Sequence, residues 1–310
     1  MTDIIETSGL TKRYGRSRGI IDLTFTVEEG ETFGFLGPNG AGKTTTIRTL
    51  LGFLRPTAGR AAIGGFDCWR QPTDVKRLVG YLPGEFALDP GLTGAQILTY
   101  LGNLHGGVDR AYLLSLIERL ELDPTKKFRD YSRGNKQKVG LIQAFMHRPR
   151  LLILDEPTGG LDPLNQQEFY RMVAEVKAEG RTTFLSSHNL TEVEHTCDRV
   201  GIIRDGRLIK VDAVHTLKEL QHHELSLVFV GPPSDTWFDG LPGVRSITPG
   251  AGHDLSLTVQ GDLGPVIQVA AEHDLVTLST REPSLEEIFL RYYAGSGASG
   301  LPTTQPVATE

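Results

Sequence analysis

Residues 37–44 read Gly-Pro-Asn-Gly-Ala-Gly-Lys-Thr and match the phosphate-binding pattern G-x-x-x-x-G-K-[ST] at every fixed position. A short apolar segment at 31–36 precedes this loop, and a helical pattern at 44–51 follows it and ends at Gly52. In this strand, loop and helix context, the backbone N–H groups of the loop and the start of the helix can face a phosphate group. The sequence therefore predicts a nucleotide site.

The residue types of this loop predict how it holds a nucleotide. Lys43 supplies a mobile cation for the outer phosphates, and the hydroxyl group of Thr44 is predicted to ligate Mg²⁺. The glycines let the backbone curl so that its N–H groups point inward. The predicted nucleotide contacts in this segment are Gly37, Pro38, Asn39, Gly40, Ala41, Gly42, Lys43, Thr44 and Thr45.

Two further strand patterns end in residues suited to phosphate chemistry. The apolar run 151–154 is followed by Asp155 and Glu156, and the run 181–187 is followed by His188. Buried parallel strands deliver the residues that follow them to one edge of the sheet, where the phosphate loop also opens. We therefore expect these three side chains beside the phosphate loop. The alternative is a strand-end pair of acids without a catalytic role.

Composition limits the class of protein. With 310 residues, of which 39% are hydrophobic and 23% charged, the chain is long enough for one large and one small globular domain. The formal net charge of -6 argues against a general nucleic-acid binder, so no nucleic-acid partner is predicted. Cys68 and Cys197 lack metal-ligand spacing and are predicted to be reduced thiols in the core.

The hydropathy pattern bears on membranes. No apolar run approaches the roughly 18 residues of a membrane-spanning helix, and the first residues lack the basic and apolar segments of a leader peptide. We therefore expect another chain to cross any membrane that this protein serves.

The order of apolar patterns predicts an α/β core over residues 1–220. Antiparallel strands at 4–10 and 20–27 lead into the phosphate loop, and a late hairpin turns at Asp205-Gly206. Helical patterns between these strands belong to an insertion at about 84–148. The prediction is thus an α/β domain with an antiparallel β subdomain and a helical subdomain.

Residues 221–294 are predicted to form a small accessory α+β domain. Their strands and helices follow the order β-α-β-β-α-β of the ferredoxin-like arrangement, with helices near 234–241 and 264–273. A capped amphipathic helix is expected at 284–293. Residues 295–310, rich in Gly, Ser, Pro and Thr, are predicted to be a disordered tail.

Three motifs, in this order, carry a resemblance to a known family. The phosphate loop, the segment Tyr-Ser-Arg-Gly-Asn at 131–135 and the strand end Leu-Asp-Glu at 154–156 resemble the nucleotide-binding subunit of ATP-binding cassette (ABC) transporters over about residues 4–220. The chain looks most like the subgroup that powers drug and antibiotic exporters. The resemblance implies a P-loop NTPase core, ATP and Mg²⁺ as cofactors, and ATP hydrolysis coupled to transport.

The signature sequence of that family is similar to Ser132, Arg133, Gly134 and Asn135, which by resemblance contact the ATP of a second copy. Arg133 stands where the family usually has glycine, and Asn135 where it usually has glutamine. Two copies would then enclose two nucleotides in a twofold dimer, for which a homodimer is the simpler expectation. Asp162 falls in the loop that links the two sites.

Other site residues follow from the same resemblance. Asp155 would join Thr44 in placing Mg²⁺. Glu156 is the candidate base that orients or deprotonates the attacking water, and His188 would contact the γ-phosphate. Tyr14 falls at the position of the aromatic residue that stacks on adenine; a half-buried tyrosine at a strand end is the alternative.

One departure from the family pattern concerns the metal site. Where the family commonly has a glutamine after a Tyr-Leu-Pro strand end, this chain has Gly84 followed by Glu85. Glu85 is a candidate Mg²⁺ ligand, directly or through a water, because a carboxylate is a better ligand for a hard cation than an amide. Alternatively, Glu85 is a solvated loop acid and the metal keeps an extra water.

The resemblance also implies partners and a location. The loop at 83–93 and the adjoining helices would dock a separate multi-span membrane permease, which itself contacts the transported small molecule, a drug-like or lipid-like compound. The chain would be cytoplasmic and peripheral on the inner face of the cell membrane. A soluble ATP-driven clamp and a regulatory module that holds ATP without turnover are the rival functions. No tandem cassette or basic arm supports the first, and Glu156 with His188 speaks against the second.

Overall fold

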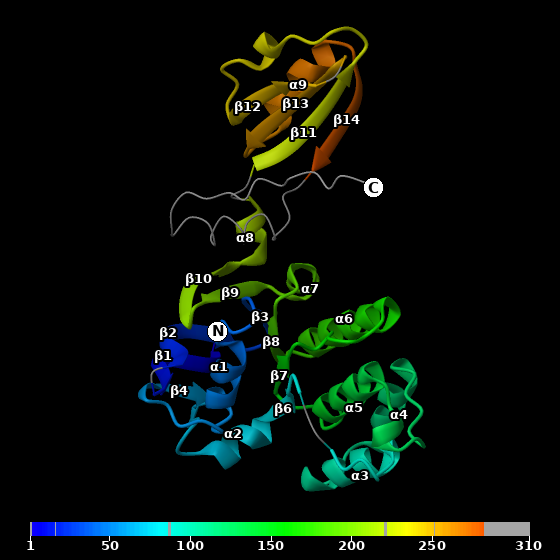
Figure 1. The fold of residues 1–310 in the computed structure, drawn as a ribbon. Helices are drawn as coiled ribbons and strands as arrows, with labels where there is room; N and C mark the ends of the chain where they lie inside the picture. Colours follow the sequence, from blue (N-terminus) through cyan, green and yellow to red (C-terminus); the bar gives the residue numbers. More distant parts are fainter. Residues whose placement is uncertain (1, 16, 86–87, 220–221, 251, 282–310) are drawn as a thin grey trace, which may run out of the picture. The chain divides into compact units, whose positions relative to one another are not determined.

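The computed structural model describes residues 2–15, 17–85, 88–219, 222–250 and 252–281 (Figure 1). The chain divides into two compact units, Met1–Val214 and His215–Glu310. The domain boundary predicted at 220–221 falls outside the described residues, directly after the short helix α8 (Val214–Glu219).

The first unit is built on a six-stranded sheet in the order β10-β9-β3-β8-β7-β6. Its neighbouring strands are parallel except for β9 and β10, which form the predicted hairpin around Asp205-Gly206. Every residue of β3, β7 and β8 is buried, as expected for strands inside a parallel sheet. The strands are β3 (Thr32–Leu36), β6 (Val79–Leu82), β7 (Leu151–Asp155), β8 (Thr182–Ser187), β9 (Arg199–Arg204) and β10 (Arg207–Ala213).

A four-stranded sheet in the order β2-β1-β4-β5 shares a hydrophobic core with this parallel sheet. Its strands pair antiparallel, which confirms the predicted antiparallel subdomain. The ring of Phe25 on β2 lies 5.6 Å from that of Phe35 on β3 and 6.3 Å from that of Phe184 on β8. Each such buried ring contributes about 1.5–3 kcal/mol, so these contacts fix one sheet on the other. The strands are β1 (Asp3–Tyr14), β2 (Ser17–Glu28), β4 (Ala58–Ile63) and β5 (Phe66–Asp67).

Capping residues set where the helices of the first unit begin. Thr93 starts α3 with a capping box, Asp109 caps α4, and Ser132 caps α5. The hydropathy pattern does not predict α2 and α7, because seven residues show too little periodicity to be recognised. The helices are α1 (Lys43–Leu50), α2 (Pro72–Leu78), α3 (Gly94–Leu104), α4 (Arg110–Arg119), α5 (Arg133–Phe145), α6 (Pro163–Ala178) and α7 (Leu190–Thr196), with a 3-10 turn η1 (Phe128–Asp130).

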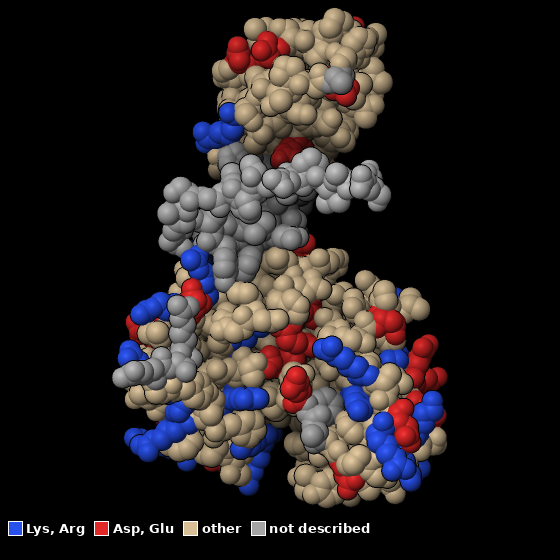
Figure 2. All heavy atoms as spheres, in the orientation of Figure 1, with Lys and Arg blue, Asp and Glu red and all other residues tan. Residues whose placement is uncertain are grey.

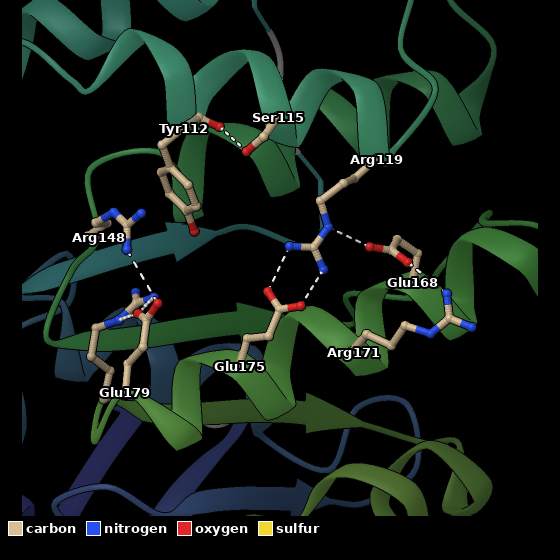
Figure 3. A network of polar contacts seen from close by, with 9 residues as sticks. Tyr112, Ser115, Arg119, Arg148, Glu168, Arg171, Glu175 and Glu179 are labelled. Carbon is tan, nitrogen blue, oxygen red and sulfur yellow. Dashed lines mark hydrogen bonds and ion pairs between the residues drawn. The ribbon is translucent and has the colours of Figure 1, made fainter.

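A network of ion pairs ties the helical insertion to α6 of the core (Figure 3). Arg119, at the end of α4, donates through Nε to Glu168 over 2.5 Å. Its two terminal nitrogens donate to the two carboxylate oxygens of Glu175 over 2.7 and 2.8 Å. Arg148, just after α5, donates to Glu179 over 3.3 Å. The insertion is therefore fixed to the core by charged contacts at more than one point.

The second unit contains an antiparallel sheet in the order β12-β13-β11-β14. Helix α9 packs on it through Val266 and Ala270, which are fully buried. The prediction of a helix over about 234–241 is wrong in its length. Only a short 3-10 helix, η2 (Asp235–Phe238), forms there. Gly240, with a φ of 75°, turns the chain away after it. The other elements are β11 (His222–Phe229), β12 (Val244–Pro249), β13 (Asp254–Gln260), α9 (Gly264–Glu272) and β14 (Leu275–Arg281).

The remaining expectations concern the C-terminal residues, the cysteines and membrane helices. The helix predicted at 284–293 and the tail predicted at 295–310 lie outside the described residues. Cys68 and Cys197 are both buried and free, as predicted. Within the described ranges, no helix combines the length and the apolar character that crossing a membrane requires.

Candidate active site

The phosphate loop turns tightly between β3 and α1, and its glycines permit that turn. Gly42 has a φ of 114°, and a side chain on Gly37 would lie 2.5 Å from the carbonyl oxygen of Ile203. The Nζ atom of Lys43 donates to the carbonyl oxygen of Gly37 over 2.6 Å. Gly37 and Ala41 are buried at the back of the loop, whereas its other residues face a cavity of about 200 Å³. This cavity is lined by Gly19, Pro38, Asn39, Gly40, Gly42, Lys43, Thr44, Thr45 and Glu156.

Asp155, at the end of β7, lies beside this loop and is 2% exposed. Its Oδ2 atom accepts a hydrogen bond from the hydroxyl group of Thr44 over 2.8 Å. Its Oδ1 atom accepts one from the hydroxyl group of Ser186, the residue opposite it on β8. A hydroxyl and a carboxylate oxygen therefore lie together where the sequence predicts them, and both are donor types that Mg²⁺ prefers. Ser186 is not among the predicted residues, although a polar residue at the end of a buried strand is a usable signal.

Glu156 connects the remaining predicted groups. Its φ of 52° is uncommon for a residue other than glycine and marks a strained backbone at this point. Its Oε1 atom lies 3.1 Å from Nζ of Lys43, and its Oε2 atom lies 2.6 Å from Nδ1 of His188. The structure thus brings Lys43, Glu156 and His188 into one cluster at the edge of the parallel sheet.

Gln137 is a site residue that the sequence motifs do not predict. Its Nε2 atom donates to the carbonyl oxygen of Glu156 over 3.2 Å and to that of Pro157 over 2.9 Å. Gln137 lies on α5, whose first turn carries Ser132 and Gly134, and it is buried. These two hydrogen bonds join α5 to the backbone of the candidate base. The only signal in the sequence is a glutamine on the apolar face of a helix.

A second cavity, of about 440 Å³, is lined by Asp155 and Glu156 and shares Asn39, Thr44 and Glu156 with the phosphate-loop cavity. Figure 2 shows acidic side chains gathered at the centre of the first unit, where β6 and β7 end. Glu85 and Arg133 line this cavity together with the two carboxylates. A side chain on Gly84 would lie 3.4 Å from Oδ2 of Asp155, so the chain segment before Glu85 approaches the predicted metal ligand closely.

Of the signature residues, Arg133 lines the cavity of about 440 Å³ together with Asn39 and Thr44 of the phosphate loop of its own chain. Among the described residues, those that line the phosphate-loop cavity include neither Ser132, Gly134 nor Asn135. Ser132 is exposed, and its Oγ atom accepts a hydrogen bond from the backbone N–H of Asn135 over 3.2 Å. A side chain on Gly134 would lie 2.6 Å from the carbonyl oxygen of Gly160, so α5 packs closely on the loop before Asp162. Hydrogen bonds from the backbone and side chain at the start of α6 hold the pKa of Asp162 below its usual range.

Tyr14 lies at the end of β1 with 42% of its surface exposed. The Nζ atom of Lys12 lies 5.5 Å from the centre of its ring. A side chain on Gly19 would come within 3.5 Å of the Tyr14 ring, and Gly19 also lines the phosphate-loop cavity. The tyrosine therefore lies near a residue that lines that cavity.

Comparison with known proteins identifies the family. A model of the ABC transporter family matches residues 20–159. The chain is 40% identical over 216 residues to the bacitracin transport ATP-binding protein BcrA of Bacillus licheniformis, and the match covers 68% of this chain and 70% of that protein. The chain belongs to the ABC transporter family. As an ABC ATPase subunit it binds and hydrolyses ATP.

Two relatives of this ABC subunit match almost its whole length. The linearmycin resistance ATP-binding protein LnrL of Bacillus subtilis is 29% identical over 302 residues, covering 93% of this chain and 97% of that protein. The Nod factor export ATP-binding protein I of Burkholderia lata is 32% identical over 292 residues, covering 93% and 96%. The matches therefore extend beyond the ABC core into the second unit.

Solved structures agree with the predicted ABC fold. The structure of an ATP-binding subunit of an ABC transporter is 31% identical, with a TM-score of 0.65 and coverage of 69% of this chain and 92% of that one. A dimeric ATP-binding cassette in a post-hydrolysis state, bound to ADP and Pi, is 20% identical to this chain with a TM-score of 0.61. At that identity, the similarity supports only a shared fold. The predicted fold of the ABC core is confirmed.

Proposed function

We propose that this ABC subunit powers an exporter. Two copies would use ATP-driven dimerisation to drive efflux of a drug-like or lipid-like compound through a separate membrane permease. Relatives that are named for bacitracin transport, linearmycin resistance and Nod factor export support this direction of transport. The subunit would then be cytoplasmic and held peripherally at the inner face of the membrane by its permease.

The observation that carries the proposed chemistry is the cluster of Lys43, Glu156 and His188. The ammonium group of Lys43 contacts the carbonyl oxygen of Gly37 and the carboxylate of Glu156. A γ-phosphate in the loop would draw Lys43 away and leave Oε1 of Glu156 able to accept a proton from the attacking water. His188, at 2.6 Å from Oε2, would hold that carboxylate in place and contact the γ-phosphate.

Thr44 and Asp155 would hold Mg²⁺, with Glu85 as a further candidate ligand. When bound, Mg²⁺ neutralises charge on the outer phosphates as the bond to the γ-phosphate breaks. The hydroxyl group of Ser186 keeps the carboxylate of Asp155 oriented toward Thr44. Glu85 shares a cavity with Asp155, which supports its role as a ligand.

The signature residues are proposed to act on the second copy. Ser132 and Gly134 lie at the start of α5, a helix of 13 residues whose N-terminus carries a partial positive charge. They are absent from the lining of the phosphate-loop cavity in the described part of their own chain. In a twofold dimer the start of α5 would cap the ATP held by Lys43 of the partner, and Asp162 would lie between the two sites.

Replacing Glu156 with glutamine tests the catalytic assignment. Loss of a general base typically lowers turnover by about 100-fold or more, and removal of a negative charge 3.1 Å from Lys43 is expected to strengthen ATP binding. Steady-state ATPase rates and titration with fluorescent ATP measure the two effects. Glu118→Gln, an exposed acid on α4, is the matched control and should leave both unchanged. Normal turnover in Glu156→Gln would refute the assignment.

Purification from detergent-solubilised membranes tests the transport role. A tagged chain should bring down a multi-span membrane protein in a fixed ratio. If the chain instead came down from the soluble fraction with ribosomes or DNA, the clamp hypothesis would replace export.

A further inference from the structure

Glu192, on α7, is a buried acid that the proposed chemistry does not use. Its exposed fraction is 0%. The hydroxyl groups of Ser187 and Thr158 lie beside its carboxyl group, but both carboxyl oxygens lack a hydrogen-bond partner, and the Ser187 hydroxyl group instead exchanges hydrogen bonds with the backbone of Asn189. An unpaired polar group in such a place lowers stability by about 1–3 kcal/mol. A structural role alone would be served better by an apolar side chain.

The two hydroxyl groups come from the two segments that matter for hydrolysis. Ser187 is the last residue of β8 and directly precedes His188. Thr158 follows Glu156 by two residues in the loop after β7. The carboxyl group of Glu192 therefore lies between the chain segment that carries the γ-phosphate contact and the segment that carries the candidate base.

We propose that Glu192 is a positioning residue for ATP hydrolysis, which holds the His188 segment against the Glu156 segment through the hydroxyl groups of Ser187 and Thr158. The inference rests on the proposed roles of Glu156 and His188. The two carboxyl oxygens accept no hydrogen bond in the structure, so this contact would form as a bound γ-phosphate draws the two segments together.

The surroundings of Glu192 determine its charge. Burial, and then the negative charge of Glu156, raises the pKa of Glu192 to about 7. The other titratable groups that face it are Tyr170 on α6, whose pKa is also raised by burial and by Glu192, and Cys197 after α7. His195, on the same helix, stacks on Tyr170. Below pH 7 the carboxyl group is neutral and can donate to one hydroxyl while accepting from the other; above pH 7 it repels Glu156.

Two substitutions separate positioning from simple packing in the full chain. Glu192→Ala should lower kcat by about tenfold to 100-fold while the affinity for fluorescent ATP changes by less than about twofold, since misplacing a catalytic group by about 1 Å can lower the rate by about 100-fold. Glu192→Gln, which keeps a donor and an acceptor but cannot ionise, should retain kcat near pH 6. It should lack the loss of activity that we expect of the native chain as pH rises through about 7.

Val193→Ala is the matched control for helix packing. Val193 neighbours Glu192 on α7 and is fully buried, and its side chain would lie 3.1 Å from a side chain on Gly34 of β3. We expect Val193→Ala to lower the melting temperature with little change in kcat. Equal loss of kcat in Val193→Ala and Glu192→Ala would overturn the inference, because helix stability would then explain both.

The failures of the two proposals can be told apart. Full activity of Glu192→Ala, in a preparation where Glu156→Gln is inactive, overturns only the role of Glu192. Normal turnover in Glu156→Gln overturns the proposed function itself, and Glu192 would then have no base to position. An unchanged pH profile in Glu192→Gln also contradicts the inference.

Discussion

Replacing Arg119 with alanine removes the side chain that joins α4 of the helical insertion to α6 of the core (Figure 3). Arg119 is 26% exposed and Glu168 is 16% exposed, whereas Glu175 is 56% exposed. An exposed ion pair contributes about 0–1 kcal/mol, so the Glu175 contact counts little despite its two hydrogen bonds. Glu168 would keep Arg171 as a partner at 3.1 Å, which limits the loss there. We expect the loss of both contacts to lower the free energy of unfolding by about 1.5 kcal/mol.

Calorimetry or circular dichroism measures this loss as a melting temperature lower by about 3–6 °C, given about 2–4 °C per kcal/mol for a unit of this size. Arg119→Lys should keep less than half of the stability that Arg119→Ala loses, because an ammonium group cannot bind a carboxylate through two parallel hydrogen bonds. Arg110→Ala is the matched control: it removes an exposed arginine from the same helix and should shift the melting temperature very little. A shift in Arg119→Ala no larger than that of Arg110→Ala would refute the reasoning.

The remaining predictions concern the site. Lys43→Ala should weaken ATP binding by at least about tenfold in a fluorescent-nucleotide titration, because a charged contact to the phosphates is lost. Glu85→Ala should raise the Mg²⁺ concentration for half-maximal ATPase activity; an unchanged value would remove Glu85 from the metal site. Glu192→Gln should melt above the native chain at pH 8 but not near pH 5. The raised pKa of Glu192 means that its neutral carboxyl group stabilises the native chain fully below pH 4.5. This stabilisation is lost as pH rises through about 7 and the group ionises. Equal melting temperatures at pH 8 would contradict the buried, ionising carboxyl group.

Local sequence signals predict the parts of the fold and site that depend on neighbouring residues. The phosphate loop, the cap at Ser132 and the strand that ends in Asp155 each depend on a few consecutive side chains. The placing of His188 beside Glu156 follows from one further rule, that parallel strands end at one edge of a sheet. The identity of the ABC core is therefore readable from the sequence alone.

Contacts between distant residues cannot be predicted in the same way. The bond from Gln137 to the Glu156 backbone joins a helix to a strand end, and nothing in either segment indicates the other. The ion pair between Lys43 and Glu156 depends on the side-chain rotamers of two residues that lie far apart in the sequence. The missing helix near 234–241 reflects Gly240, whose left-handed backbone leaves room for only one turn. The burial of Glu192 is unexpected because an acid in a short polar helix is usually exposed.

The most direct test of the central claim is the mass of Glu156→Gln in solution, measured by light scattering after size-exclusion chromatography. With ATP and Mg²⁺ we expect the mass of two chains, and with ADP or no nucleotide the mass of one. Ser132→Arg, placed in the same variant, should block the ATP-dependent dimer while the phosphate loop still binds nucleotide. A Glu156→Gln chain that binds ATP fully and keeps the mass of one chain would contradict the account.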